Sequence, residues 1–408
     1  MTWRILARVS CPALLSLVCG GAAFAQTTWY VDAGATPPGA GTPASPFASI
    51  QYAIDRPTTV AGDTVLVAPG TYQESLGIFK PITVKSSHGP LATILESSAG
   101  IDGVHLDWGG ASPVFEGFSV QSTTQISGIY APTGTVRGCI VSDCTSVAGI
   151  ECPGCWIESS TIARNNLGVV GAGLGVGTIR ITNSAVWGNA QANLDPGATP
   201  VIESFNAGFG SPANGSLPGD PGFWDLPSSD FHLRPGSPCI DAGDPAGPLD
   251  PDGSRIDIGA LVYDPTYAPG PSVYCTGKVN SQGCTPAIGS TGSASASGAG
   301  PFAISGTNVL PGKPALLLLG GGKSSTAFQG GVLCVAQPVK RLGSQISAGV
   351  SPCAGTLGFD MQAYVQSGVN PALGPGALAS VQWWSRDPLD PAGFGSSLSD
   401  ALFFGVAP

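Results

Sequence analysis

Short strand-like segments recur along the first half of the chain at a nearly constant spacing. Val120, Val141, Ile162 and Val186 stand 21, 21 and 24 residues apart, each in a segment that alternates apolar and polar positions. A repeat of this length with one short strand in each copy predicts a parallel β-helix, in which successive coils stack. Because side chains alternate between the two faces of a strand, we expect this set to point into the coil. The residues two positions earlier should point inward as well: Phe118, Cys139, Ser160 and Ser184.

The repeats extend in both directions. "DTVLVAPGTY" and "KPITVKSS" read as earlier coils, "TWYVD" as an entry strand and "TPVIESFNAGF" as a last coil. Between them, "SPFASIQYAID" predicts a short amphipathic helix with Ser45 as N-cap, Pro46 at N1, and Phe47, Ile50 and Ile54 on one face. A helix in this place would cover the open end of the coil and protect an exposed strand edge.

The pattern changes near residue 272. The runs "GPFAISGTNV", "PALLLLGGG", "GGVLCVAQPV", "FDMQAYV" and "ASVQWWSRD" are strand-like and separated by turn residues, which predicts a β-sandwich. The predicted fold class is therefore all-β, with a right-handed parallel β-helix followed by a C-terminal β-sandwich. We expect a leader at 1–25, the β-helix with its N-terminal capping helix at 26–265, a linker at 266–271 and the sandwich at 272–408.

Several segments resemble known proteins. "TWYVDAGATPPGAGTPASPFASIQYAID" with "GDTVLVAPGTYQESL" resembles the opening of secreted bacterial proteins of unknown function in the right-handed β-helix family related to pectate lyases. "SPCIDAGDPAGPLDPDGSRIDIGALVYD" resembles the end of such domains, so this resemblance covers roughly residues 27–265. The block from "VYCTGKVNSQGCTPAIG" to "LSDALFFGVAP" resembles a module that recurs at the ends of secreted proteins of planctomycete-like bacteria. These resemblances imply fold and export, and they bring no catalytic residues with them.

The N-terminus has the order of a cleaved secretory signal. Arg4 and Arg8 precede the apolar run "ALLSLVCGGAAFA", with small residues at Ala23 and Ala25 before the expected cut. A membrane span needs roughly 20 predominantly apolar residues, so we expect a secreted or cell-surface protein without a membrane span. With 16 basic against 26 acidic residues and no basic run, the chain is not expected to bind nucleic acid.

Four cysteines lie within 17 residues, from Cys139 to Cys155. In the repeat register Cys139 points inward, and Cys144 occupies the turn position that Asn165 and Asn189 hold in later coils, where asparagines often stack. A four-thiolate zinc site needs converging pairs, and an exported chain favours disulfides, so we expect structural bridges. A redox role for the CxxC pair lacks the surrounding βαβ pattern. The expected disulfide residues are Cys144, Cys152, Cys155, Cys275, Cys284, Cys334 and Cys353, with a local Cys275–Cys284 loop as one pairing and Cys139 or Cys239 left over.

Charged residues follow the same register. Glu116, Arg137 and Glu158 are 21 residues apart and should stack as alternating charges, as should Asp143 and Arg164. Neighbouring strands lie roughly 4.8 Å apart, so such charges neutralise one another. A polysaccharide lyase needs calcium-binding carboxylates beside an unpaired basic residue, and these ladders argue against one.

Five residues stay as catalytic candidates if the chain is an enzyme. "IDGVHLDWGG" places Asp102, His105 and Asp107 close together, while Glu151 and Arg180 belong to neither ladder. The alternative interpretation of the first three is a polar coil edge. The chain has no G-x-S-x-G nucleophile motif, which removes support for a serine hydrolase.

Two further groups are candidates for binding. Asp250, Asp252 and Asp257 form part of a weak calcium-loop pattern that lacks the distal Glu of an EF-hand; the alternative is a turn-rich cap in which the carboxylates accept from backbone amides. No other cofactor is expected.

Trp383 and Trp384 are adjacent, so on a strand they face opposite ways, and an exposed one beside Arg386 could stack on a sugar or a partner protein. The alternative is an aromatic side chain packed under a loop.

These observations support three hypotheses. The leading one is a secreted, non-catalytic module that binds an extracellular glycan or a surface protein. The competing one is a carbohydrate-active enzyme, a lyase or glycoside hydrolase, built on the coil. In the third, the β-helix is a rigid spacer and the sandwich carries the function. Clustered, unpaired groups on the coil face favour an enzyme, and laddered, paired groups favour a scaffold.

Overall fold

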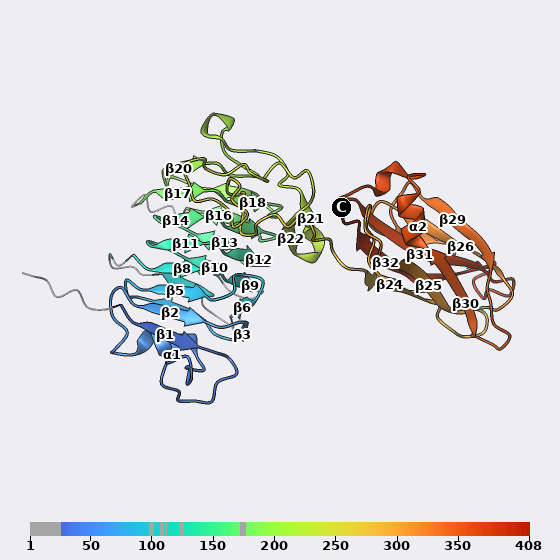
Figure 1. Cartoon of the computed structure of the whole chain (residues 1–408), viewed down its shortest axis with the longest axis horizontal. Helices are drawn as coiled ribbons and strands as arrows, with labels where there is room; N and C mark the ends of the chain where they lie inside the picture. The colour runs from blue at the N-terminus through green and yellow to red at the C-terminus, as the bar shows by residue number, and fades with distance from the viewer. Residues whose placement is uncertain (1–25, 98–101, 107–109, 111, 122–125, 172–176) are drawn as a thin grey trace, which may run out of the picture.

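The computed structural model describes residues 26–97, 102–106, 110, 112–121, 126–171 and 177–408, so the predicted leader at 1–25 lies outside it. The protein is all-β, as predicted: a parallel β-helix is followed by antiparallel sheets (Figure 1). In the part of the chain that the structure describes, no helix is long and apolar enough to cross a membrane.

Three parallel sheets run along the β-helix, and we number them 1 to 3 in the order in which each coil visits them. Sheet 1 contains β1 (Thr28–Val31), β2 (Thr64–Val67), β5 (Thr83–Ser86), β8 (Val114–Glu116), β11 (Thr135–Arg137), β14 (Trp156–Glu158), β17 (Ile179–Thr182) and β20 (Val201–Ser204). Sheet 2 contains β3 (Gly70–Tyr72), β6 (Thr93–Glu96), β9 (Ser119–Gln121), β12 (Ile140–Ser142), β15 (Thr161–Ala163) and β18 (Ala185–Trp187). Sheet 3 contains β4 (Leu76–Ile78), β7 (Val104–Leu106), β10 (Ser127–Tyr130), β13 (Ala148–Glu151), β16 (Leu167–Val170) and β19 (Ala192–Asp195).

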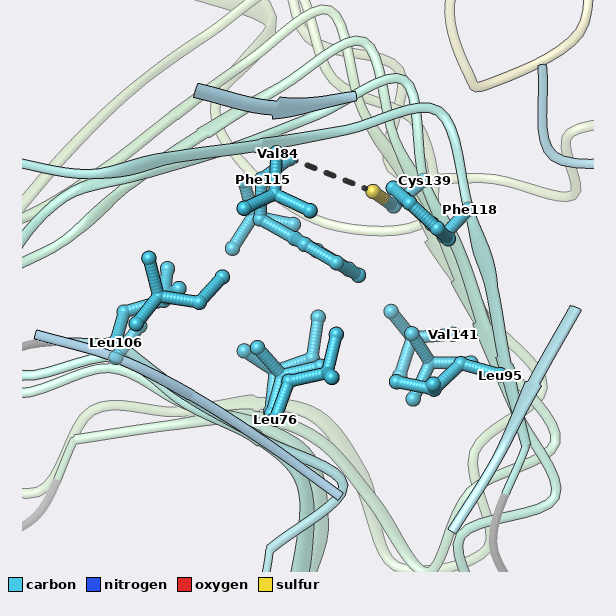
Figure 2. Close-up of a cluster of buried hydrophobic side chains, with 14 of the residues drawn as sticks. Leu76, Val84, Leu95, Leu106, Phe115, Phe118, Cys139 and Val141 are labelled. Carbon is cyan, nitrogen blue, oxygen red and sulfur yellow. Dashed lines mark hydrogen bonds between the residues drawn. The ribbon is translucent and has the colours of Figure 1, made fainter. Parts of the chain in front are cut away.

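The predicted repeat register is confirmed in sheet 2. Val141 pairs with Val120 on one side and with Ile162 on the other, and Ile162 pairs with Val186. All four side chains are fully buried. Figure 2 shows Phe118, Cys139 and Val141 pointing into the coil, where the rings of Phe115 and Phe118 stack with centroids 4.5 Å apart. Burial of each large apolar side chain contributes about 1.5–3 kcal/mol, so this stacked interior is the main source of stability.

The capping helix forms, but it begins later than predicted. Helix α1 (Ile50–Asp55) has Ser49 as its N-cap, whose Oγ accepts from the Tyr52 amide at 3.1 Å. The Glu74 carboxylate accepts from the next two amides, those of Ile50 and Gln51. The predicted N-cap, Ser45, is wrong because the chain stays extended through Phe47, which bridges to the entry strand β1.

The segment after the last coil folds back over sheet 2. The hairpin β21 (Phe223–Asp225) and β22 (Asp230–Leu233), the short 3-10 turns Pro212–Asn214 and Leu226–Ser228, and the irregular chain to residue 264 belong to it. Cys239 and Ile258 pack on the side chains of Ile140, Ala163 and Ala185, which project outward from sheet 2. The outward surface of β12, β15 and β18 is thereby covered, and sheets 1 and 3 are left to present open faces.

Two antiparallel sheets form the C-terminal sandwich. One contains β23 (Ser272–Tyr274), β32 (Ser396–Gly405), β31 (Leu378–Arg386), β26 (Pro314–Gly320) and β29 (Lys340–Ile346). The other contains β24 (Ala287–Gly292), β25 (Phe302–Val309) and β30 (Gly355–Asp360). The hairpin β27 (Lys323–Phe328) and β28 (Gly331–Val335) lies apart from both sheets, and a 3-10 turn, Pro371–Leu373, precedes β31. Side chains from both main sheets, including Ile304, Leu357, Leu317 and Phe404, share one buried core.

One strand prediction in this region is wrong. The run "FDMQAYV" is the end of β30 followed by helix α2 (Met361–Gln366). The Asp360 carboxylate caps the helix by accepting from the Ala363 amide at 2.9 Å, and Met361 and Val365 are buried in the sandwich core. A good N-cap and a buried helical face outweigh the strand preference of the single sequence run.

The cysteines form three disulfides: Cys152–Cys155, Cys275–Cys334 and Cys284–Cys353. The local Cys275–Cys284 loop is therefore wrong. Cys275 instead follows the edge strand β23 and ties it to β28, which packs on β31 and β32. The expectation of a disulfide at Cys144 is also wrong: its thiol is buried at the turn and donates to the Ser142 carbonyl, at 3.6 Å between sulfur and oxygen.

Candidate functional site

The outward face of sheet 1 carries the predicted ladder of alternating charges. Arg137 lies between Glu116 and Glu158, at nitrogen–oxygen distances of 3.6 and 2.8 Å, and Lys85 extends the ladder by pairing with Glu116 at 2.6 Å. The second predicted pair, Asp143 and Arg164, is present as well, at 2.7 Å. These side chains are partly exposed, so each pair contributes little to stability, but each carboxylate has a cationic neighbour.

A half-exposed tryptophan lies beside this ladder. Trp156, on β14, is 48% exposed and pairs in register with Thr135 on β11 and with Arg180 on β17. The guanidinium carbon of Arg180 lies 5.1 Å from the centre of the indole ring. The next register partner, Ile202 on β20, is 58% exposed. The row therefore offers an aromatic face, a cation and an apolar side chain to solvent.

A hollow of about 530 Å³ opens next to Trp156. Besides the indole, its walls carry three hydroxyl side chains, two charged side chains of the ladder and two glycines: Ser112, Thr133, Thr135, Arg137, Glu158, Gly134 and Gly154. An aromatic face flanked by hydroxyl and charged groups can stack on the apolar face of a pyranose while it hydrogen-bonds to the sugar hydroxyls.

The turn that precedes Trp156 is rigid. The Cys152–Cys155 disulfide closes the "CPGC" turn immediately before β14, and both cysteines are fully buried. A Cβ at Gly154 would approach the Pro132 carbonyl oxygen to 3.0 Å, so the coils are in close contact there. A side chain presented by such a turn loses little freedom when it binds a ligand.

Sheet 3 brings together three of the five catalytic candidates. His105, Tyr130 and Glu151 are successive register partners on β7, β10 and β13. Asp102 precedes β7, and its carboxylate accepts from the backbone amide of Ser127 at 3.1 Å. The Ser127 hydroxyl in turn donates to Glu151, at 3.3 Å between oxygens.

The carboxyl groups of this cluster are electrostatically coupled. Burial raises the pKa of Asp102, which its hydrogen bond from Ser127 and the nearby His105 oppose. Burial also raises the pKa of Glu151, and the charge of Asp102 raises it further, against the hydrogen bond from Ser127. Within the described residues, the Nε2 atom of His105 is buried and has no hydrogen-bond partner.

The other two catalytic candidates do not join this cluster. Arg180 lies on sheet 1 over Trp156, and its Nη1 atom donates to the Thr178 carbonyl at 3.4 Å. Asp107 lies outside the described residues.

The tryptophans of the sandwich occupy enclosed positions. Trp383 is 1% exposed and donates through Nε1 to the Ser305 carbonyl at 3.0 Å. Trp384 faces the other way, packs against Leu318 and Leu333 near the β27–β28 hairpin, and donates to Gln329 at 2.8 Å. Arg386, at the end of β31, is exposed. Sequence reasoning singled out this pair and missed Trp156, although the 21-residue register already places Trp156 beside Thr135.

The three aspartates of the weak calcium pattern accept from backbone amides, as the alternative interpretation predicted. Asp250 accepts from the Asp257 amide at 2.9 Å and Asp252 from the Ser254 amide at 2.9 Å. Asp257 accepts from the amides of Asp241 and Tyr263, at 2.7 and 2.6 Å. Across the described part of the chain, no three His, Cys, Asp or Glu side chains are arranged to hold a metal ion.

Comparison with known proteins adds no family. No protein-family model matches this chain, and no curated protein matches it.

Proposed function

We propose that the chain is an exported β-helix protein that binds glycan on the outward face of sheet 1. The observation that carries this proposal is the position of Trp156, half exposed beside a hollow of about 530 Å³ and held under Arg180. An aromatic ring bordered by hydroxyl groups is suited to a pyranose, whose two faces are apolar and whose rim is polar.

This face is suited to binding rather than to catalysis. Glu116 and Glu158 both pair with Arg137, and Glu116 pairs with Lys85 as well. A carboxylate that is already matched by a cation is a poor general base, because the cation favours its ionised, weakly basic form. The paired ladder therefore supports a non-catalytic role for sheet 1.

Export is supported by the three disulfides, which form and persist in oxidising compartments. The expected leader at 1–25 agrees with that location.

The test is retention on immobilised polysaccharides, measured by affinity electrophoresis of the purified chain and of Trp156→Ala. We expect the wild-type chain to be retarded by at least one glycan and the variant to bind about tenfold more weakly, equivalent to about 1.4 kcal/mol. Trp384→Phe in the sandwich is the matched control and should bind like the wild type.

Loss of retention in Trp384→Phe but not in Trp156→Ala would assign binding to the sandwich and reduce the β-helix to a spacer. Failure of every glycan to retard the wild-type chain would contradict the proposal and leave a protein partner for this face.

A second candidate function, a carbohydrate-active enzyme, is favoured by one observation. Asp102 and Glu151 approach each other through Ser127 on sheet 3, at a distance from the paired ladder of sheet 1.

A further inference from the structure

An aromatic column runs across the outer side of sheet 3. The rings of Phe79 and His105 lie 5.3 Å apart, and those of His105 and Tyr130 lie 4.9 Å apart. Phe79 is 59% exposed, and its ring lies over Gly77, the register partner of His105. A Cβ at Gly77 would lie 2.6 Å from the Phe79 ring, so a glycine is needed there for the ring to lie flat.

The column ends at a pair of carboxyl groups. Glu151 is the register partner of Tyr130, and the fully buried Ser127 connects it to Asp102. No basic side chain in the described ranges forms an ion pair with either carboxyl group, whereas each glutamate of the ladder on sheet 1 has such a partner. The two faces of the coil therefore differ in kind: one is neutralised, and the other holds two carboxyl groups that compete for protons.

We infer that Glu151 and Asp102 are the acid and base of a glycoside hydrolase site on sheet 3, which takes a neutral glycan whose rings lie along Phe79, His105 and Tyr130. This site is separate from the glycan-binding face of sheet 1 and does not depend on it.

The surroundings assign the two roles. Glu151 is destabilised as an anion by burial and by the charge of Asp102, so it keeps its proton to higher pH. Asp102 is also partly buried, but the Ser127 amide and His105 favour its anion, so it ionises first. The other titratable groups on the neighbouring strands are Tyr130, whose pKa burial raises, and, beyond Val170, the exposed Asp195. Two coupled carboxyl groups with separated proton affinities are what an acid–base pair requires.

The reaction is a hydrolysis without net oxidation or reduction. Glu151 donates its proton to the glycosidic oxygen, and the bond between that oxygen and the anomeric carbon breaks. A water molecule attacks the anomeric carbon and gives a proton to Asp102, so a new carbon–oxygen bond forms. Transfer of that proton back to Glu151 through solvent restores the starting state.

The charge of the site determines the substrate class. An acidic glycan would bring further negative charge to a pair of carboxyl groups that lacks a cationic partner among the described residues, and it would be repelled. A neutral glycan meets no such repulsion, and its apolar faces match the aromatic column.

The test measures release of reducing ends from four neutral probes, β-1,3-glucan, β-1,4-glucan, β-mannan and starch, across acidic to neutral pH. We expect cleavage of at least one probe, and a rate about 100-fold lower in Glu151→Gln and in Asp102→Asn. Asp195→Asn, which removes an exposed carboxylate from the same sheet, is the matched control and should cleave like the wild type. Circular dichroism establishes that each variant is folded, and Glu151→Asp replaces Glu151→Gln if the latter does not fold.

Ser127 is a positioning residue in this scheme. Ser127→Ala should lower kcat more than it raises KM, and it should shift the pH profile, because both carboxyl groups lose a shared partner. Loss of stability alone would leave the pH profile where it is.

Two outcomes would overturn the inference: no reducing ends from any of the four probes, or equal cleavage by the wild type and by both carboxyl variants. Unsaturated products would overturn it as well, since they indicate elimination rather than hydrolysis. Trp156→Ala separates the two proposals, because it should lose retention on glycan while cleavage at sheet 3 continues.

Discussion

The guanidinium carbon of Arg180 lies 5.1 Å from the centre of the Trp156 ring, and the two residues are register partners on adjacent strands. The pair is partly exposed, where an interaction of this kind contributes about 0.5–1 kcal/mol. Arg180 thus orients the indole without burying it, and the outer face of the ring stays available to a ligand.

A double-mutant cycle measures this interaction. We expect Trp156→Leu and Arg180→Met to show a coupling free energy of about 0.5–1 kcal/mol in the urea unfolding of the β-helix. The control cycle combines Trp156→Leu with Lys85→Met, three strands away on the same sheet, and should be additive within about 0.3–0.5 kcal/mol. Additivity in both cycles would show that Arg180 does not orient the indole.

The asparagine stack at the turn after sheet 2 leads to a second prediction. Asn165 is buried, accepts from the Cys144 amide at 3.0 Å, and donates to the Val141 carbonyl at 3.0 Å and to Asn189 at 3.1 Å. Asn165→Ala leaves a buried amide and a buried carbonyl without partners, so we expect the free energy of unfolding to fall by about 2–4 kcal/mol.

The neighbouring asparagine provides the control for that measurement. Asn166 makes its hydrogen bonds at the surface, to Ser146 and Gln191, where water can replace them. Asn166→Ala should therefore cost no more than about 0.5 kcal/mol in the same chemical denaturation experiment. A similar loss in both variants would mean that burial of the stacked amides is not the source of stability.

The regular part of this fold could be predicted because its contacts are repeated at a fixed spacing. Val120, Val141 and Ile162 pair as the 21-residue spacing indicates, and the charge ladder around Arg137 follows the same register. The sheet 3 cluster does not keep that spacing. Ser127 lies 25 residues after Asp102 and 24 residues before Glu151, since coil lengths vary between the strands.

Other features depend on contacts that a single sequence does not reveal. Cys275 and Cys334 are 59 residues apart and meet only because a hairpin packs on the edge of the sandwich sheet. The N-cap of α1 moves to Ser49 because Phe47 bridges to β1. In both cases tertiary packing decides between local alternatives that sequence pattern alone leaves equal.

The acidic cap predicts a dependence of stability on pH. Burial and the neighbouring charges of Asp257, Asp252 and Asp241 raise the pKa of Asp250 to about 6, against the hydrogen bond from the Asp257 amide. A carboxyl group with a raised pKa in the fold stabilises it fully below the unfolded pKa of about 3.9, and this contribution disappears as pH rises through the folded pKa.

We therefore expect the free energy of unfolding of the β-helix to fall between about pH 4 and pH 6, and the Asp250→Asn variant to lose part of that slope. Asp252→Asn is the control: Asp252 is exposed, and the Ser254 amide lowers its pKa, so its replacement should leave the slope in this window unchanged. Denaturation at a series of pH values checks both variants, and an unchanged slope in Asp250→Asn would contradict the assignment.

The sandwich contains a buried ion pair whose removal should be costly. Lys278 and Asp390, with side chains 7% and 1% exposed, lie 2.6 Å apart, and Lys278 also donates to the carbonyls of Gln329 and Ser396. Burial alone would raise the pKa of Asp390, but the Lys278 ammonium and the amides of Ala392 and Phe394 outweigh it and hold the pKa below its ordinary value.

Asp390→Ala leaves a buried ammonium without its counter-charge, so we expect a loss of about 3–5 kcal/mol in the free energy of unfolding of the sandwich. The double variant Lys278→Met with Asp390→Leu removes both charges and should be more stable than Asp390→Ala. Because the pKa of Asp390 is lowered in the fold, the contribution of the pair is present above about pH 3.9 and should disappear as pH falls through the lower folded pKa. Thermal unfolding at neutral and strongly acidic pH distinguishes these cases: if Asp390→Ala were as stable as the double variant at neutral pH, the ammonium would not depend on Asp390.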